Sequence, residues 1–272
     1  MRRVRQKKAT AAPKGAHEEP IRDGIRVVHL DNWNCFDDYI TQRMLDRRQF
    51  IWRGHASDRW LLESTLDRLL RNLGKLKHKT VRNEHLERYR YSTRGRRGVN
   101  PPKLETENEW WALGQHFGLA TPLLDFTASP YVAAYFAFYP EESDGADRRA
   151  VFGVSRISVR VGNETILEDW KGTGRAPIVE LVEPLSDENP RLVSQGGLFT
   201  RSPDGVDLES WFRQQFAGDT STMRLVKITI PSADRELALR NLNRMNINHL
   251  SLFPDLYGAS RFTNLDLLIK KY

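Results

Sequence analysis

The densest apolar pattern in the chain lies at residues 109–139, where three elements follow one another. The first is a predicted helix, because its apolar residues recur at helical spacing and Thr106 and Glu109 can form a capping box. A short apolar run at 123–126 predicts a buried strand. The last segment, 131–139, is apolar almost all round, so we expect a buried helix. This helix–strand–helix unit is the predicted centre of the protein.

The rest of the pattern predicts short strands separated by helices and long connections. Predicted strands span residues 25–30, 50–52, 150–155, 177–183, 225–230 and 250–255. Predicted helices span residues 33–45, 60–73, 208–216, 233–245 and 257–261. This succession is typical of an α+β protein, with small mixed or antiparallel sheets packed against helices. We expect one main domain over residues 21–272.

Composition is consistent with a well-packed core. The 272 residues are 39% hydrophobic and 10% aromatic, which is enough for a substantial interior. No apolar run approaches the roughly 20 residues that span a membrane, and the first residues lack the apolar segment of a signal peptide. The single cysteine, Cys35, leaves no internal disulfide framework and favours a reducing compartment. We therefore expect a cytoplasmic protein.

The net charge of +7 is unevenly distributed. Residues 1–14 hold six Lys or Arg and no acid, and residues 71–97 hold ten against two acids, so the remainder carries −7. We expect residues 1–20 to form a disordered basic arm. Residues 71–104 form a second basic segment, which we call the basic insert. The protein is thus a mildly acidic body with two basic segments.

Both basic segments are candidates for binding nucleic acid or an acidic protein. Tyr89 and Tyr91 interleave with Lys and Arg in the insert, and this combination suits phosphate contact with base stacking. The candidate nucleic-acid-binding residues are Lys75, Lys77, Lys79, Arg88, Arg90, Arg94, Arg96 and Arg97. A solvated tail and a helix with a charged outer face would show much the same composition, so both interpretations stay open.

Four polar residues, Gln115, His116, Asp125 and Thr127, fall within the apolar central unit. A polar group in such surroundings costs a few kcal/mol unless it finds a partner. Asp125 ends an apolar strand just before a helix N-terminus, where backbone N–H groups and the helix dipole stabilise an anion. These residues either brace the helices or form the wall of a pocket.

Arg53 follows the predicted strand 50–52 and needs a partner for the same reason. Its guanidinium suits a carboxylate or a phosphate, so it either pairs with an acid such as Asp125 or binds an anionic ligand. Gly54 permits close approach of the backbone to a neighbour. The glycines that follow Gln195 permit a similar approach to a ligand or a strand.

The common catalytic and cofactor motifs do not occur. The chain has no Gly-x-x-x-x-Gly-Lys loop, no Gly-x-Gly-x-x-Gly, no His-Glu-x-x-His and no Gly-x-Ser-x-Gly. It also lacks a Cys/His set for zinc. The usual cofactor enzymes are therefore disfavoured, and no resident cofactor or metal is predicted.

The central motif is similar to the signature of the FRG domain family. It consists of Gln115-His-Phe-Gly-Leu-Ala-Thr-Pro-Leu-Leu-Asp-Phe-Thr127, followed by Ser-Pro-x-x-Ala-x-Tyr-Phe-Ala. Trp52-Arg53-Gly54 occupies the place of the Phe-Arg-Gly motif for which the family is named. Two further segments, 191–199 and 252–258, also resemble the family. The chain departs from the family pattern at Trp52, Phe117, Ala120, Pro122 and Phe126.

The resemblance implies a function, because FRG domains occur mostly in bacteria and phages, often in contexts that suggest toxins or anti-phage effectors. The order of their motifs resembles that of ADP-ribosyltransferases, which makes NAD a candidate substrate. On this resemblance Arg53 would clamp the pyrophosphate or ribose of NAD, and Asp255 would stabilise the oxocarbenium-like charge. The implied catalytic residues are Arg53, Asp125 and Asp255. The implied substrate-binding residues are His55, Gln115, His116, Thr127, Tyr135 and Gln195, with Tyr131 as an alternative to Tyr135 for the aromatic wall.

Two other hypotheses belong to different classes. In a non-catalytic nucleic-acid-binding module, Arg53, Asp125 and Gln195 would pair with one another without a cavity, whereas the enzyme requires them to meet in one pocket. A metal-dependent nuclease would use Asp125, Asp255 and His116, and needs its carboxylates within about 4–6 Å of each other. An inhibitor or a partner protein of a defence system is also consistent with the resemblance.

Overall fold

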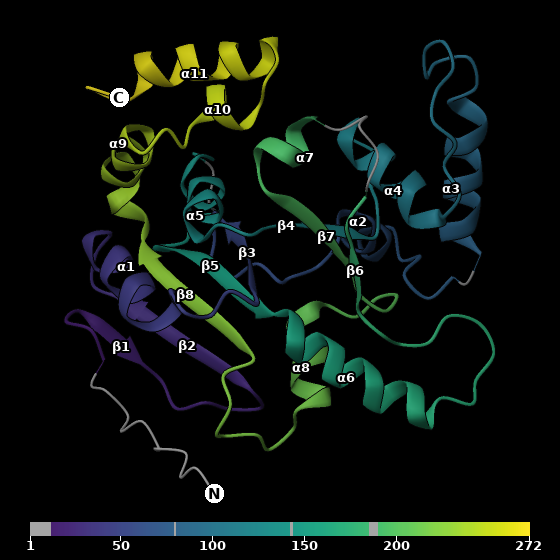
Figure 1. Ribbon diagram of the computed structural model, residues 1–272, viewed down its shortest axis with the longest axis horizontal. Helices are drawn as coiled ribbons and strands as arrows, with labels where there is room; N and C mark the ends of the chain where they lie inside the picture. Colours follow the sequence, from purple (N-terminus) through teal and green to yellow (C-terminus); the bar gives the residue numbers. More distant parts are fainter. Residues whose placement is uncertain (1–11, 79, 142–143, 185–189) are drawn as a thin grey trace, which may run out of the picture.

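The computed structural model describes residues 12–78, 80–141, 144–184 and 190–272. Within this part of the chain the strands form one eight-stranded sheet, in the order β1-β2-β8-β5-β3-β4-β7-β6 (Figure 1). The strands are β1 (Ala16–Glu18), β2 (Ile25–Leu30), β3 (Phe50–His55), β4 (Leu123–Thr127), β5 (Arg148–Ser155), β6 (Glu180–Val182), β7 (Gly197–Arg201) and β8 (Leu225–Pro231). The pairing of β2 with β8 is parallel, and the other neighbouring pairs are antiparallel.

Helices cover both faces of this sheet (Figure 1). They are α1 (Asn34–Tyr39), α2 (Thr65–Asn72), α3 (Val81–Ser92), α4 (Glu107–His116), α5 (Pro130–Phe138), α6 (Arg156–Asp169), α7 (Pro190–Ser194), α8 (Leu208–Gln215), α9 (Arg235–Arg244), α10 (His249–Leu252) and α11 (Leu256–Leu268). A π-helical turn, Ile40–Met44, continues α1, and a 3₁₀ turn, Ser232–Asp234, precedes α9. The predicted α+β class is confirmed, with one large mixed sheet in place of several small ones.

The central strands are buried on both faces, because alternate side chains enter two different cores. Along β5, Val151 belongs to the core formed with α1, α5 and α9. Its neighbours Ala150 and Phe152 belong to the core formed with α6 and α8. A third apolar cluster joins α2, α3 and α4 to β4 and β7.

The predicted helix–strand–helix unit is confirmed as α4, β4 and α5. Thr106 and Glu109 form the capping box at the start of α4. Ser129 caps α5, and Pro130 occupies its first position. Helix α5 lies so close to β3 that a Cβ atom on Gly54 would be 1.9 Å from the Ala133 carbonyl oxygen. This close contact fixes the end of β3 against the helix.

Several predicted elements are wrong or were missed. Residues 250–255 form no strand; the chain there ends α10 and turns into α11, for which Asp255 is the N-cap. Strand β7 and helix α6 were not predicted. The predicted strand 177–183 contracts to β6.

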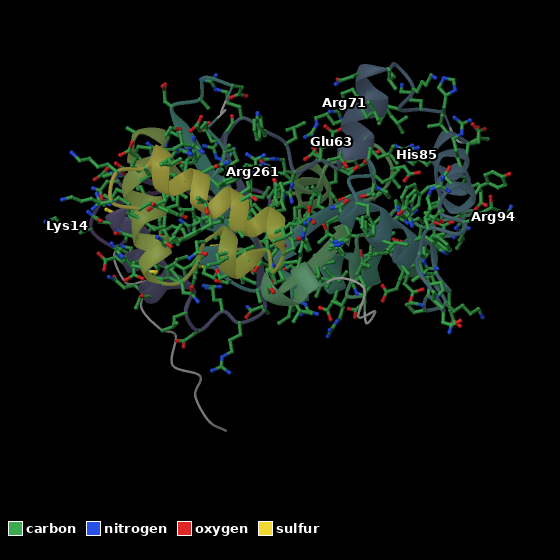
Figure 2. The ribbon with its side chains drawn as sticks, turned by 90° about the horizontal axis from the view of Figure 1, so that it is seen from above. Lys14, Glu63, Arg71, His85, Arg94 and Arg261 are labelled. Carbon is green, nitrogen blue, oxygen red and sulfur yellow. The ribbon has the colours of Figure 1, made fainter. Side chains whose placement is uncertain are left out.

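The described start of the chain lies far from the basic insert. Residues 1–11 of the predicted arm lie outside the described residues, and Ala16–Glu18 form β1 beside β2, so the disordered arm was predicted to extend too far. The basic insert contains α3, which lies at the edge of the molecule in Figure 1. Lys14 and Arg94 lie at opposite ends of the view in Figure 2. No helix within the described ranges is long and apolar enough to cross a membrane.

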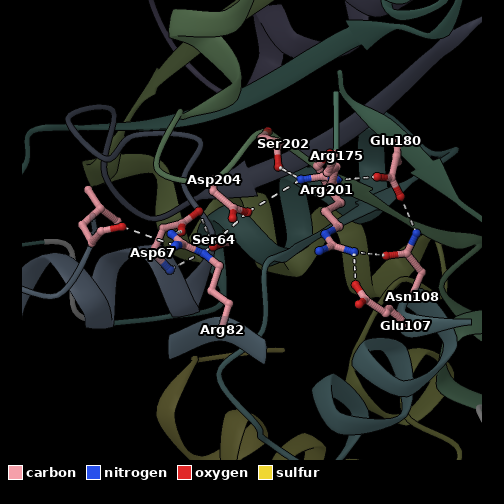
Figure 3. A network of polar contacts seen from close by, with 11 residues as sticks. Ser64, Asp67, Arg82, Glu107, Asn108, Arg175, Glu180, Arg201, Ser202 and Asp204 are labelled. Atoms are coloured by element: carbon pink, nitrogen blue, oxygen red, sulfur yellow. Dashed lines mark hydrogen bonds and ion pairs between the residues drawn. The ribbon is translucent and has the colours of Figure 1, made fainter. Parts of the chain in front are cut away.

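Charged contacts fix α3 to α2, and α4 to β6 and β7 (Figure 3). Arg82 of α3 is buried and pairs with Asp67 of α2, and its Nε lies 3.5 Å from an Asp204 carboxylate oxygen. Arg175 pairs with Glu180 at 2.6 Å. The network continues through Asn108, Glu107 and Arg201. The insert is therefore anchored at its base by ion pairs.

Candidate functional site

A cleft of about 440 Å³ lies between β3, β4, α7 and the loop that precedes α2. Most of the predicted catalytic and substrate-binding residues line it, although they come from distant parts of the chain. They are Arg53, His55, Gln115, His116, Asp125, Thr127 and Gln195. Clefts of this size bind small molecules. The convergence expected of an enzyme is thus present in the geometry.

Arg53 is held in the cleft by contacts within its own strand, β3, and with the neighbouring strand β4. Its Nε donates to Nε2 of His55 at 3.0 Å, and its Nη1 donates to the carbonyl oxygen of Asp125 at 2.8 Å. Nη1 also lies 3.6 Å from the Asp125 carboxylate. Burial lowers the pKa of Arg53, and the Asp125 charge opposes that effect. The guanidinium is therefore fixed in position before any ligand binds.

His55 is a buried, neutral acceptor for Arg53. Burial, followed by the positive charge of Arg53, lowers the pKa of His55 to about 3. Since Nε2 accepts the Arg53 hydrogen bond, the proton of the neutral ring belongs on Nδ1. His55 therefore orients Arg53 and adds no charge to the cleft.

Asp125 is the exposed carboxylate of the cleft. Its side chain is 60% exposed, because Leu124 and Phe126 on either side of it point into the core. Gln115 donates to its carboxylate at 2.9 Å. Ser129, and not Asp125, caps the helix that follows. The side chain of Asp125 is thus exposed in the cleft.

Thr127 and Gln195 brace the cleft wall. The Thr127 hydroxyl donates to the Gln195 carbonyl oxygen at 2.7 Å and accepts from the Ser129 amide at 3.1 Å. The Gln195 side chain donates to the carbonyl oxygen of Leu252 at 3.2 Å. These bonds tie β4, the turn before β7 and α10 together, so both residues act on the shape of the cleft.

Two predicted residues lie elsewhere. Asp255 does not line the cleft; it caps α11 and accepts a hydrogen bond from Nε of Arg191 at 2.9 Å. Tyr135 is fully buried, and its hydroxyl bonds to His249. The aromatic lining of this wall comes from Phe136 instead. Its predicted alternative, Tyr131, bonds to Asp37 and is also absent from the lining.

Three charged residues of the cleft were missed by the sequence analysis: Glu63, Arg68 and Arg191. Glu63 is buried and pairs with Arg71 at 2.5 Å (Figure 2). Burial raises the pKa of Glu63, although Arg71 opposes this effect. A Glu in the apolar run around Leu61 and Leu62 was the available signal, since a charge in such a run needs a partner.

The two carboxylates required by the nuclease hypothesis do not both line the cleft. Asp125 is in the cleft, whereas Asp255 is engaged by Arg191 outside the lining. Across the described part of the chain, no three His, Cys, Asp or Glu side chains are grouped so that they could hold a metal ion.

The candidate nucleic-acid-binding residues of the insert fall into two groups. Arg90 and Arg97 lie over the Trp110 ring, 5.5 and 5.2 Å from its centroid. Arg96 donates to the Ser92 carbonyl oxygen. These three cations stabilise the insert itself. The remaining described candidates, Lys75, Lys77, Arg88 and Arg94, are exposed, as is Arg96. Lys79 lies outside the described residues.

The molecule is thus an α+β protein whose cationic cleft is built from the Trp-Arg-Gly strand and the motif that ends in Asp125 and Thr127. Residues 48–146 match the model of the FRG domain family, as the motifs predict. This match includes Arg53 and Asp125, whereas Arg191 and Gln195 lie beyond it. No curated protein and no solved structure gives a significant match.

Proposed function

We propose that this protein is an enzyme that acts on a nucleotide-type substrate, in the manner of an ADP-ribosyltransferase or NAD glycohydrolase, and that it serves as a toxin or anti-phage effector. One observation carries the proposal: Arg53 and Asp125, from separate strands, present a guanidinium and an exposed carboxylate to the same cleft. A nucleotide with a reactive sugar offers an anion and a developing positive charge to such a pair.

Arg53 and Asp125 have different roles in this proposal. Arg53 holds the phosphate or ribose end of NAD, oriented by His55. Asp125 faces the sugar and stabilises the positive charge that develops at its anomeric carbon when the bond to nicotinamide breaks. Gln115 keeps the Asp125 carboxylate in place through its 2.9 Å hydrogen bond. Asp255, outside the cleft, has no part in the chemistry.

The test is NAD consumption by the purified protein, with and without nucleic acid and cell lysate. Arg53→Ala should lower kcat/KM at least about 100-fold, because it removes a preorganised charge. Arg53→Lys keeps the charge and loses the planar fork, so it should retain only part of the activity. Arg160→Ala, an exposed arginine of α6 outside the cleft, is the matched control. Circular dichroism and melting curves would show that each variant is folded.

A nucleic-acid-binding module is the second candidate, supported by the outer face of the insert. Tyr91 is 71% exposed, and Arg94 lies 5.1 Å from its ring centroid. An exposed ring beside a cation suits base stacking. If NAD is not consumed while salt-sensitive nucleic-acid binding persists in Arg53→Ala, this function replaces the enzyme.

A further inference from the structure

Arg68 is the cleft guanidinium whose charge is least compensated. It is an exposed residue of α2 and lines the cleft. Among the described residues, no hydrogen bond, ion pair or ring contact engages its side chain. Arg191, by comparison, donates to the Asp255 carboxylate at 2.9 Å. An arginine in a cleft without a carboxylate partner is available to an anionic ligand.

The carboxylates that also line the cleft are already engaged by other groups. Glu63 is paired with Arg71 at 2.5 Å, and the charge of Arg68 has only a smaller effect on the Glu63 pKa. Asp125 receives a hydrogen bond from Gln115 and lies 3.6 Å from Arg53. These pairs leave the positive charge of Arg68 as the local excess.

Arg53 alone offers only part of its guanidinium fork to a phosphate. Its Nε is taken by His55 and its Nη1 by the Asp125 carbonyl oxygen, so most of its planar fork is used inside the protein. Arg68 is close enough that its charge lowers the pKa of both Arg53 and His55, after the larger effect of burial. A phosphate between the two guanidinium groups would remove this repulsion.

We propose that Arg68 is the principal phosphate-binding residue of the cleft and that the ligand is a nucleotide carrying a pyrophosphate. The nucleotide part of this inference rests on the proposed function. Aromatic side chains in the same lining, Trp60, Phe136 and Phe253, provide surfaces for a base. Trp60 is 40% exposed and is therefore accessible for stacking. Arg53 then acts at the sugar, next to Asp125.

Isothermal titration calorimetry with inorganic pyrophosphate, ADP-ribose and adenosine tests this assignment. Arg68→Ala should weaken the binding of ADP-ribose and of pyrophosphate about 10- to 100-fold, as expected for loss of charged hydrogen bonds. It should leave adenosine binding unchanged. Arg68→Lys should recover part of the loss, and Arg160→Ala should bind like the wild type.

The outcomes separate this inference from the proposed function. If phosphate binding depends on Arg68 but NAD is not consumed, the inference is supported and the proposed enzymatic function is rejected. NAD consumption with an unchanged KM in Arg68→Ala would support the enzyme and overturn the inference. Equal binding of ADP-ribose by the wild type and Arg68→Ala, or no binding of pyrophosphate by the wild type, would also overturn it.

Discussion

Gly54 is the residue on which the closeness of β3 and α5 depends. A Cβ atom there would lie 1.9 Å from the Ala133 carbonyl oxygen and 2.6 Å from the Ala137 amide nitrogen. Both are backbone atoms, so a rotamer change cannot relieve the contact. Because Arg53 and His55 flank this glycine, its close packing also determines where they lie.

Gly54→Ala should therefore destabilise the protein by about 3 kcal/mol, since overpacking against backbone must move the helix. Gly118→Ala is the control, because Gly118 has φ +86° and open space around it. That change should cost only about 1 kcal/mol. Urea unfolding of the two variants gives the comparison, and equal losses of stability would contradict the role assigned to Gly54.

Arg53 and Asp125 could be predicted from the sequence, whereas Phe136 and Arg68 could not. Arg53 and Asp125 interrupt the apolar runs of β3 and β4, where a charge needs a partner, and this signal is local. Helix α5 is apolar almost all round, so nothing in its pattern says that Phe136, and not Tyr135, faces the cleft. From the sequence, Arg68 is an ordinary surface charge of an amphipathic helix. Only the folded structure places it in the same cleft lining as residues of β3 and β4.

At the scale of the elements, the basic insert depends on one buried cation. Arg82 and Asp67 are both buried, and Asp67 also accepts from the Ser64 hydroxyl at 2.9 Å. Arg82→Met leaves the Asp67 charge without its partner, which should cost about 3–5 kcal/mol.

Hydrogen exchange of α3, combined with urea unfolding, would measure the effect of Arg82→Met. Arg88→Met, on the exposed side of the same helix, should be nearly neutral. If the two variants unfolded alike, the ion pair would not be what anchors the insert.

Cap chemistry explains which elements were predicted correctly. The Thr106–Glu109 capping box was read from the sequence and is present. Asn248 and Asp255 also cap helices, but the apolar alternation between them predicts a strand. Ser155 ends β5 and caps α6 with no loop between them, so the pattern gave no boundary there. Apolar periodicity alone could not separate these cases.

At the scale of the whole molecule, stability should depend on pH through two buried histidines. Burial, followed by the charge of Arg261, lowers the pKa of His249 to about 4, and the pKa of His55 is about 3. The unfolded chain binds these protons at an ordinary pKa of 6.5. The stabilisation is therefore complete above pH 6.5 and is lost as the pH falls toward 4.

The expected slope is about 1.4 kcal/mol per pH unit for each histidine between pH 6 and 4.5. His249→Asn keeps a hydrogen-bonding group near the Tyr135 hydroxyl. It removes one titrating group, so it should reduce this slope by about 1.4 kcal/mol per pH unit. His78→Asn, at an exposed position, is the control. Urea unfolding across this pH range would measure the slope, and a wild-type slope equal to that of His249→Asn would refute the assignment to His249.

The position of β8 determines how late during synthesis the sheet can be completed. Strand β8 lies between β2 and β5, and pairs Leu225 with Ile25 across two hundred residues of chain. During synthesis β2 can pair only with β1 until β8 has left the ribosome, because β8 is its other neighbour in the sheet. Closing so long a loop is slow, so most of the nascent chain precedes the strand that completes the sheet.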